Sequence, residues 1–155
     1  MGTVEQIFIA PSRQSAVQEA KAVELEAGRG IVGDRYHALA EKAQQSERTV
    51  RENHLTLIAK EELDNFLANH SSDLHYGEFR RNIITSGIDL NTLVKQQFRI
   101  GDALCQGIEL CEPCATLART VHSGVLPGLV HKGGLRAVVL ESGNVQVGST
   151  ITASQ

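Results

Sequence analysis

Fourteen glycines divide this chain of 155 residues into short apolar runs. Glycine permits tight turns and weakens the interior of a strand, so apolar runs that end at glycines predict many short strands. We expect strands at residues 4–10, 23–25, 55–59, 82–85, 98–100, 103–110, 135–140, 145–147 and 149–152. Apolar residues at helical spacing predict a helix over residues 61–69, whereas residues 16–25 fit either a helix or a strand.

A local repeat indicates how these strands are arranged. Residues 98–104 and 145–151 share one order of residue types. Two apolar residues with one variable residue between them are followed by Gly101 or Gly148, and then by a polar, a small and an apolar residue. Glycine at such a corner permits a sharp bend, and small β-barrels use such corners to close. Two unrelated turns would explain the likeness equally well. Together with the number of short strands, the repeat favours a β-rich mixed α/β fold with a barrel-like core and a few short helices.

The charge balance argues against a nucleic-acid-binding protein. Fifteen Lys and Arg against eighteen Asp and Glu give a formal charge of −3, and aromatic residues make up 4% of the chain with no Trp. A strongly basic surface and aromatic platforms for stacking bases are therefore poorly supplied. We expect no nucleic-acid partner.

Length and cysteine content give the expected cellular context. A chain of this size corresponds to one domain, residues 1–155. The longest apolar runs are far shorter than the roughly 20 residues of a membrane span, and no signal peptide is visible. Three cysteines are an odd number at low density, which suits a reducing compartment. We expect a cytoplasmic protein with no membrane partner.

The strongest local signal for chemistry is the pair Cys111 and Cys114, separated by Glu112 and Pro113. A strand is expected to end at residue 110 and a short helix to begin after Pro113, which places Cys114 at a helix N-terminus. Helix N-termini stabilise a thiolate, the form that attacks electrophiles, carries sulfur or binds a soft metal. A thioredoxin-like disulfide and an inert buried pair remain alternatives. A structural zinc site is disfavoured because only Cys105 supplies a further thiol.

Two other segments are candidates for binding. The segment 28–37 holds three glycines in six residues, followed by Asp34, Arg35 and His37, so its backbone turns tightly. Asp34 beside Arg35 forms either a buried pair that orients the loop or a solvated surface pair. Arg80 and Arg81 precede an expected strand, and alternation along that strand would expose Arg80 and turn Arg81 inward. An inward arginine needs an anionic partner, and phosphate suits the guanidinium group because it can be bound by two parallel hydrogen bonds.

Five motifs in register resemble the MOSC domain, the module named after the C-terminal part of molybdenum cofactor sulfurases. Residues 30–37 resemble the Gly-Leu-x-Gly-Asp-Arg-His element of that family, and residues 55–63 its strand-then-helix segment. Residues 80–90 are similar to its Arg-Arg-Asn-x-x-x-x-Gly-x-x-Leu run, the most specific of the five. Residues 98–103 and 111–114 resemble its Ile-Gly strand and its Pro-Cys element. The likeness runs over nearly the whole chain and is that of a small stand-alone member.

The resemblance implies a barrel-like fold and binding of the molybdenum cofactor, a molybdopterin. It implies that Cys114 is the metal ligand and the catalytic residue. It also implies that five residues bind the cofactor, namely Asp34, Arg35, His37, Arg81 and Asn82. The expected activity is reduction of a small N-oxygenated substrate, with electrons from a partner protein. One alternative is a sulfur carrier that takes sulfur from a donor protein, with a persulfide on Cys114 and Cys111 as the resolving thiol. Another is a cofactor-binding module without turnover.

Overall fold

A closed barrel of seven strands forms the centre of the computed structural model, which describes residues 1–12, 15–49, 53–69, 75–111 and 133–154. In order around the barrel the strands are β1 (Gly2–Ile9), β11 (Thr150–Ala153), β7 (Gln97–Ile100), β8 (Ala103–Leu110), β9 (Leu135–Glu141), β5 (Leu55–Ala59) and β6 (Ile83–Ser86). The pairing of β1 with β11 closes the ring. Only β5 and β6 pair in parallel within it. The β-rich, barrel-like fold predicted from the sequence is thereby confirmed.

Two further groups of strands lie beside the barrel. Strand β2 (Gln18–Ala20) extends the large sheet by pairing with β1. A small antiparallel sheet is formed by β10 (Gly143–Gln146), β3 (Ala22–Glu26) and β4 (Gly30–Ile31). Residues 16–25, which fitted a helix or a strand, therefore form parts of β2 and β3.

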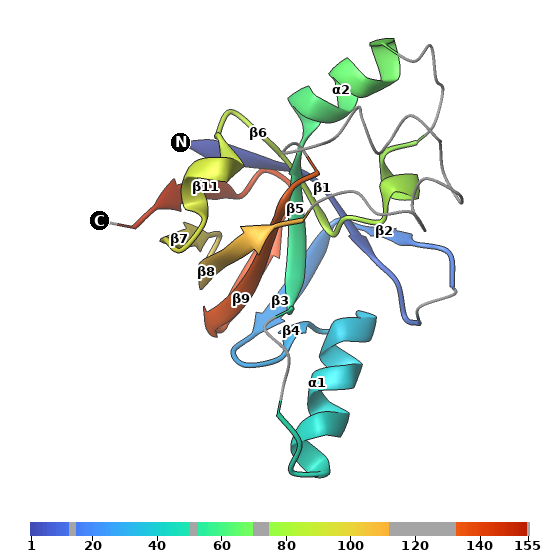
Figure 1. The fold of residues 1–155 in the computed structure, drawn as a ribbon, viewed down its shortest axis with the longest axis vertical. Helices are drawn as coiled ribbons and strands as arrows, with labels where there is room; N and C mark the ends of the chain where they lie inside the picture. The colour runs from blue at the N-terminus through green and yellow to red at the C-terminus, as the bar shows by residue number, and fades with distance from the viewer. Residues whose placement is uncertain (13–14, 50–52, 70–74, 112–132, 155) are drawn as a thin grey trace.

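Helices lie at opposite ends of the barrel in the described ranges. Figure 1 shows α2 (Lys60–Asn69) at the top of the view and α1 (Arg35–Gln45) at the bottom. The described ranges also hold two short 3-10 helices, η1 (Tyr76–Phe79) and η2 (Leu90–Leu93). Across the described part of the chain, no helix has both the length and the apolar character that a membrane crossing requires.

Helix α2 agrees with the sequence prediction, whereas α1 was not predicted. The three glycines of residues 28–33 predicted a tight turn that continued through residue 37. The missed signal is Asp34, an N-cap residue type whose carboxylate accepts from the backbone N–H of Tyr36. Such a cap satisfies an amide that has no partner inside the helix, and thereby fixes where α1 begins.

Strand β5 has buried residues on both of its faces, because the barrel core and a second apolar cluster lie on either side of it. Leu55 and Leu57 point into the barrel core, whereas Ile58 belongs to the second cluster, which lies under α2. The other buried members of that second cluster are Phe8, Leu63, Phe66, Phe79 and Ile84. A strand covered on both faces reads as a continuous apolar run rather than an alternating one.

The two glycines of the sequence repeat do occupy corners between strands. Gly101 has φ of +54° and Gly148 has φ of +95°, a region that side chains with a Cβ rarely adopt. They differ in packing, because a Cβ on Gly101 would lie 2.6 Å from the carbonyl oxygen of Asn144, whereas a Cβ on Gly148 would meet nothing within 4 Å. The segments that hold them pair directly, with Ile151 opposite Ile100.

Acidification should destabilise the barrel through His54. This side chain is 6% exposed, and its Nδ1 accepts from the N–H of Val139 at 2.9 Å, so it is neutral in the fold. Burial lowers the pKa of His54 below its ordinary 6.5, so below that pH the unfolded chain takes up a proton that the folded chain refuses. The stability contribution of the neutral form is complete above about pH 6.5 and is lost as the pH falls toward the lowered pKa.

We expect the His54→Asn variant, whose amide oxygen replaces the Nδ1 acceptor, to lose less stability between pH 7 and pH 5 than the parent. The difference in slope is at most about 1.4 kcal/mol per pH unit for a single group. Urea unfolding at a series of pH values measures it, with His75→Asn at an exposed histidine as the control. Equal slopes for the parent and His54→Asn would contradict this role of His54.

Candidate anion-binding cleft

The buried carboxamide of Asn82 connects three parts of the fold. Its Nδ2 donates to the carbonyl oxygen of Phe8 at 3.1 Å and to Asp34 Oδ1 at 3.4 Å. Its Oδ1 accepts from the backbone N–H of Thr56 at 3.0 Å and from Thr56 Oγ1 at 3.2 Å. Because Asn82 is only 6% exposed, these contacts replace water, and they fix β1, β5 and the start of α1 to one another.

Asp34 is buried, but not as a pair with Arg35. Its Oδ1 accepts from the N–H of Ala10 at 2.9 Å, and its Oδ2 accepts from the N–H of Tyr36 at 3.4 Å. It is 3% exposed, and among the described residues its hydrogen bonds come from these amides and from Asn82. Both alternatives offered for Asp34, a buried pair with Arg35 and a solvated surface pair, are therefore corrected, since Asp34 is buried and backbone amides and Asn82 donate to its carboxylate.

Arg35 is thereby left to project from the first turn of α1. Its backbone N–H donates to the carbonyl oxygen of Ala10 at 2.8 Å, which anchors the residue to the end of β1. Its guanidinium donates to Tyr36 Oη at 2.8 Å and lies 4.7 Å from the centroid of that ring. Among the described residues no carboxylate forms an ion pair with Arg35, so its guanidinium retains the ability to bind an anion.

Arg80 lies beside Arg35 and is held in an uncommon backbone conformation. It follows η1 as the C-cap, with φ of 60° and ψ of 31° in the left-handed region, and its Nη1 donates to the carbonyl oxygen of Ser15 at 3.0 Å. Burial, and after it the positive charge of Arg35, lower the pKa of Arg80. Two guanidinium groups in mutual repulsion at a partly buried position favour binding of an anion.

The reason given for expecting Arg80 to be exposed was wrong. Strand β6 begins only at Ile83, so Arg80 and Arg81 lie in the turn before it and strand alternation does not apply to them. Both arginines are half-buried.

Arg81 fixes the two ends of one long segment. Its Nε donates to the carbonyl oxygen of Gly133 at 2.8 Å, and its Nη2 donates to that of Cys111 at 3.2 Å. Cys111 and Gly133 flank residues 112–132 directly. Cys114, the predicted metal ligand, falls within that segment and so lies outside the described residues.

One small cleft gathers four of the five predicted cofactor-binding residues. Its lining residues are Phe8, Ala10, Val17, Asp34, Arg35, Tyr36, Arg80, Arg81 and Asn82. His37 is not among them. It lies on α1, where its Nε2 is 3.5 Å from Glu26 Oε1 and its Nδ1 is 3.9 Å from Glu41 Oε2.

Tyr36 was not predicted to line a cleft, and Arg80 was predicted to be solvated. The adjacency of Tyr36 to Arg35 was visible in the sequence, but a contact between neighbouring side chains has no sequence signature. For Arg80 the deciding feature is its left-handed conformation, which the sequence does not signal.

The two described cysteines are free thiols in different surroundings. Cys105 lies in the barrel core with no exposed surface, and burial raises its pKa to about 12. Cys111 is 5% exposed, and its Sγ accepts from Arg136 Nη2 at 3.9 Å. Among the described residues, no group of three or more His, Cys, Asp or Glu side chains is arranged to hold a metal ion.

Comparison with known proteins gives the family. The model of the MOSC domain matches residues 33–152, so the chain belongs to the MOSC domain family. No curated protein matches its sequence.

Solved structures share the fold at low sequence identity. The YuaD protein of Bacillus subtilis is 17% identical with a TM-score of 0.82, and the alignment covers 100% of this chain and 98% of that one. YiiM of Geobacillus stearothermophilus is 12% identical with a TM-score of 0.75 over 100% of this chain and 76% of the other. YiiM of Escherichia coli is 16% identical with a TM-score of 0.71 over 100% and 70%.

Removal of the Asn82 carboxamide should unfold the chain more easily. In Asn82→Ala the Phe8 carbonyl and the Thr56 amide lose their buried partner, which costs about 2–4 kcal/mol of unfolding free energy. Chemical denaturation measures the loss. The control is Asn144→Ala, at an exposed position on β10, for which we expect a change within about 0.5 kcal/mol. A similar small change in Asn82→Ala would contradict the linking role of the residue.

Thiol reactivity should follow the surroundings of the cysteines. With limiting iodoacetamide we expect labelling of Cys114 before Cys105, because the thiolate is the reactive form and the pKa of Cys105 is raised to about 12. Peptide mass spectrometry at successive times gives the order. Faster labelling of Cys105 in the folded protein would contradict the assignment of Cys114 as the reactive thiol.

Proposed function

We propose that this MOSC domain protein binds the molybdenum cofactor, with the phosphate group against the guanidinium groups of the arginine cleft and the Cys114 thiolate on the metal. The cleft itself has a volume of about 10 Å³, which is room for about one water molecule, so the phosphate would lie at its opening and not inside it. The observation that carries the proposal is the charge of the cleft. Three guanidinium groups line it, against one lining carboxylate, Asp34, whose oxygens are occupied by backbone amides and Asn82. A phosphate carries the opposite charge and has the geometry that guanidinium groups bind best.

The residues present fit the anionic end of such a cofactor. Arg35 and Arg80 lie close enough that the charge of Arg35 lowers the pKa of Arg80, and a bound phosphate would relieve that repulsion. The hydrogen bonds from Arg81 to the carbonyl oxygens of Cys111 and Gly133 support the placement of the Cys114 thiolate near the cleft. Cys114 follows Cys111 by three residues, so the chain can separate their Cα atoms by at most about 11 Å.

Each residue then has a distinct task. Arg35 and Arg80 bind the phosphate, while Arg81 holds the two ends of the segment that contains Cys114. Asp34 positions Arg35 because it caps the start of α1, and Asn82 holds Asp34 in place through a hydrogen bond. The cofactor, when bound, supplies a metal that accepts electrons and exchanges an oxygen atom with the substrate. We propose a small N-oxygenated compound as the substrate, an electron-donor protein as the partner and the cytoplasm as the location.

A sulfur carrier is the second candidate, favoured by one contact of Cys111. Arg136 donates to the sulfur of Cys111, and it also pairs with Glu109 at 2.7 Å, which holds it in place. A cationic hydrogen-bond donor favours the thiolate form of a cysteine. Cys111 can therefore act as the resolving thiol that attacks a persulfide on Cys114. In this role the chain takes sulfur from a donor protein. A cofactor-binding module without turnover would share the cleft of the first candidate.

Two cysteine variants distinguish these functions. We expect Cys114→Ser to lose the molybdenum retained per chain after expression in a host that makes the cofactor, because a ligand must lend its thiolate directly. Cys111→Ser should retain most of the metal, since the hydrogen bond to Arg81 comes from its backbone carbonyl and not from its side chain. Metal analysis of the purified proteins, together with pterin analysis, measures both.

Equal loss in both variants would point to a shared dithiol site. Absence of molybdenum even from the parent, together with a mass increase of one sulfur atom on Cys114, would replace the first candidate by the sulfur carrier. Turnover of the loaded parent with an artificial reductant would distinguish the enzyme from a module without turnover.

A further inference from the structure

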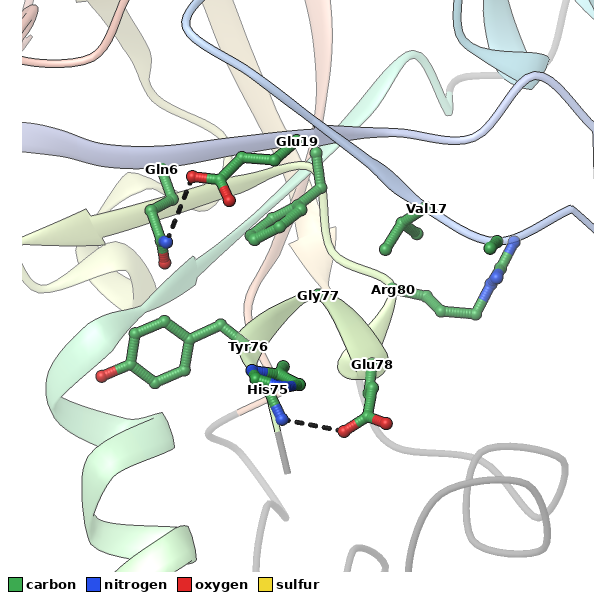
Figure 2. Close-up of a pocket in the computed structure, with 10 residues that line it drawn as sticks. Gln6, Val17, Glu19, His75, Tyr76, Gly77, Glu78 and Arg80 are labelled. Atoms are coloured by element: carbon green, nitrogen blue, oxygen red, sulfur yellow. Dashed lines mark hydrogen bonds between the residues drawn. The ribbon is translucent and has the colours of Figure 1, made fainter. Parts of the chain in front are cut away.

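A larger hollow opens beside the arginine cleft. It has a volume of about 830 Å³ and shares Phe8, Val17 and Arg80 with the cleft. Figure 2 shows Gln6 and Glu19 on one side of it and the side chains of η1 on the other. A ligand that bound here would therefore lie next to whatever group occupies the cleft.

Two aromatic side chains line this hollow, in a chain with only four phenylalanines and two tyrosines. Phe8 lies against Gly77, where a Cβ would come within 3.0 Å of its ring. Tyr76 is held by its hydroxyl, which donates to Asp64, and Asp64 also accepts from Lys60 at 2.9 Å. Burial, and after it Asp64, raise the pKa of Tyr76, so the phenol stays neutral. Neutral rings fixed in this way attract organic cations through their faces.

The charges at the rim have the sign that such a cation requires. Glu19 Oε2 accepts from Gln6 Nε2 at 3.4 Å, and Glu78 Oε2 accepts from the backbone N–H of His75 at 2.8 Å. Among the described residues, no lysine or arginine forms an ion pair with either carboxylate. Arg80 lines the hollow too and keeps its positive charge, so the lining holds two carboxylates against one guanidinium.

We infer that this hollow binds a small organic cation, which is attracted by the carboxylates on its two sides, Glu19 and Glu78, and whose apolar body lies against Phe8 and Tyr76. Positive guanidinium groups in the cleft and carboxylates in the hollow would then receive groups of opposite charge side by side. The assignment of this cation as the substrate rests on the proposed function, whereas its binding does not. Because both carboxylates are exposed, binding is expected to be weak, on the order of millimolar.

Three probes of one shape and different charge test the inference on the full, metal-free chain. Benzamidine is cationic, benzamide is neutral and benzoate is anionic. We expect saturable shifts of the Ala16, Val17 and Gly77 amide signals in two-dimensional NMR with benzamidine, at least threefold weaker binding of benzamide, and none of benzoate. Glu19→Gln and Glu78→Gln should each weaken benzamidine binding about two- to fivefold.

The controls make charge the only variable. Glu78→Gln keeps an oxygen that accepts from the His75 amide, and Glu24→Gln removes the same charge from an exposed position on β3, outside the hollow. Unchanged binding in Glu24→Gln supports the inference. Equal binding of benzamidine and benzoate, shifts confined to other residues, or equal loss in Glu24→Gln would overturn it. Because no cofactor is present, failure here leaves the molybdenum proposal standing, and failure of molybdenum loading leaves this result standing.

Discussion

The buried carboxamide of Asn82 is the interaction on which the cleft depends. It satisfies the Phe8 carbonyl, the Thr56 amide and one oxygen of Asp34 at once, at a position where only 6% of the residue is exposed. Asp34 in turn caps α1 and so fixes the direction from which Arg35 leaves the helix. Backbone amides and an amide side chain hold the Asp34 carboxylate, and for that reason Asp34 does not form an ion pair with Arg35.

Local patterns in the sequence were enough to predict the barrel strands and α2. Strand β5 was found because its residues are apolar on both faces, and both glycine corners were found because their backbone conformation favours glycine. Contacts between distant segments were not predictable in this way. Asn82 meets Phe8 across 74 positions, and Arg81 meets Gly133 across 52. Arg35, Arg81, Asp34 and Asn82 were placed together only by the family resemblance, and His37 lies elsewhere.

Arg80 connects the two cavities. It lies in a left-handed backbone conformation that costs a residue with a Cβ roughly 1–2 kcal/mol, so surrounding contacts must hold it there. The hydrogen bond to Ser15 is one such contact. Arg80 lines both cavities. In the cleft the charge of Arg35 repels its guanidinium, and in the hollow two carboxylates are part of the lining. The guanidinium of Arg35 lies on one side of Arg80 and the two carboxylates lie on the other. Neighbouring cavities with lining charges of opposite sign can select ligand groups of opposite sign.

Binding of a phosphate monoester tests the central claim, that the Asn82 network presents Arg35 as part of an anion site. Phenyl phosphate titrated into the metal-free protein should bind saturably by calorimetry or NMR, and Arg35→Gln should weaken it about tenfold, because a charged hydrogen bond in a partly buried cleft is lost. Lys42→Gln, at an exposed position on the same helix, should leave binding unchanged. Absence of saturable binding, or an equal loss in Lys42→Gln, would contradict the account.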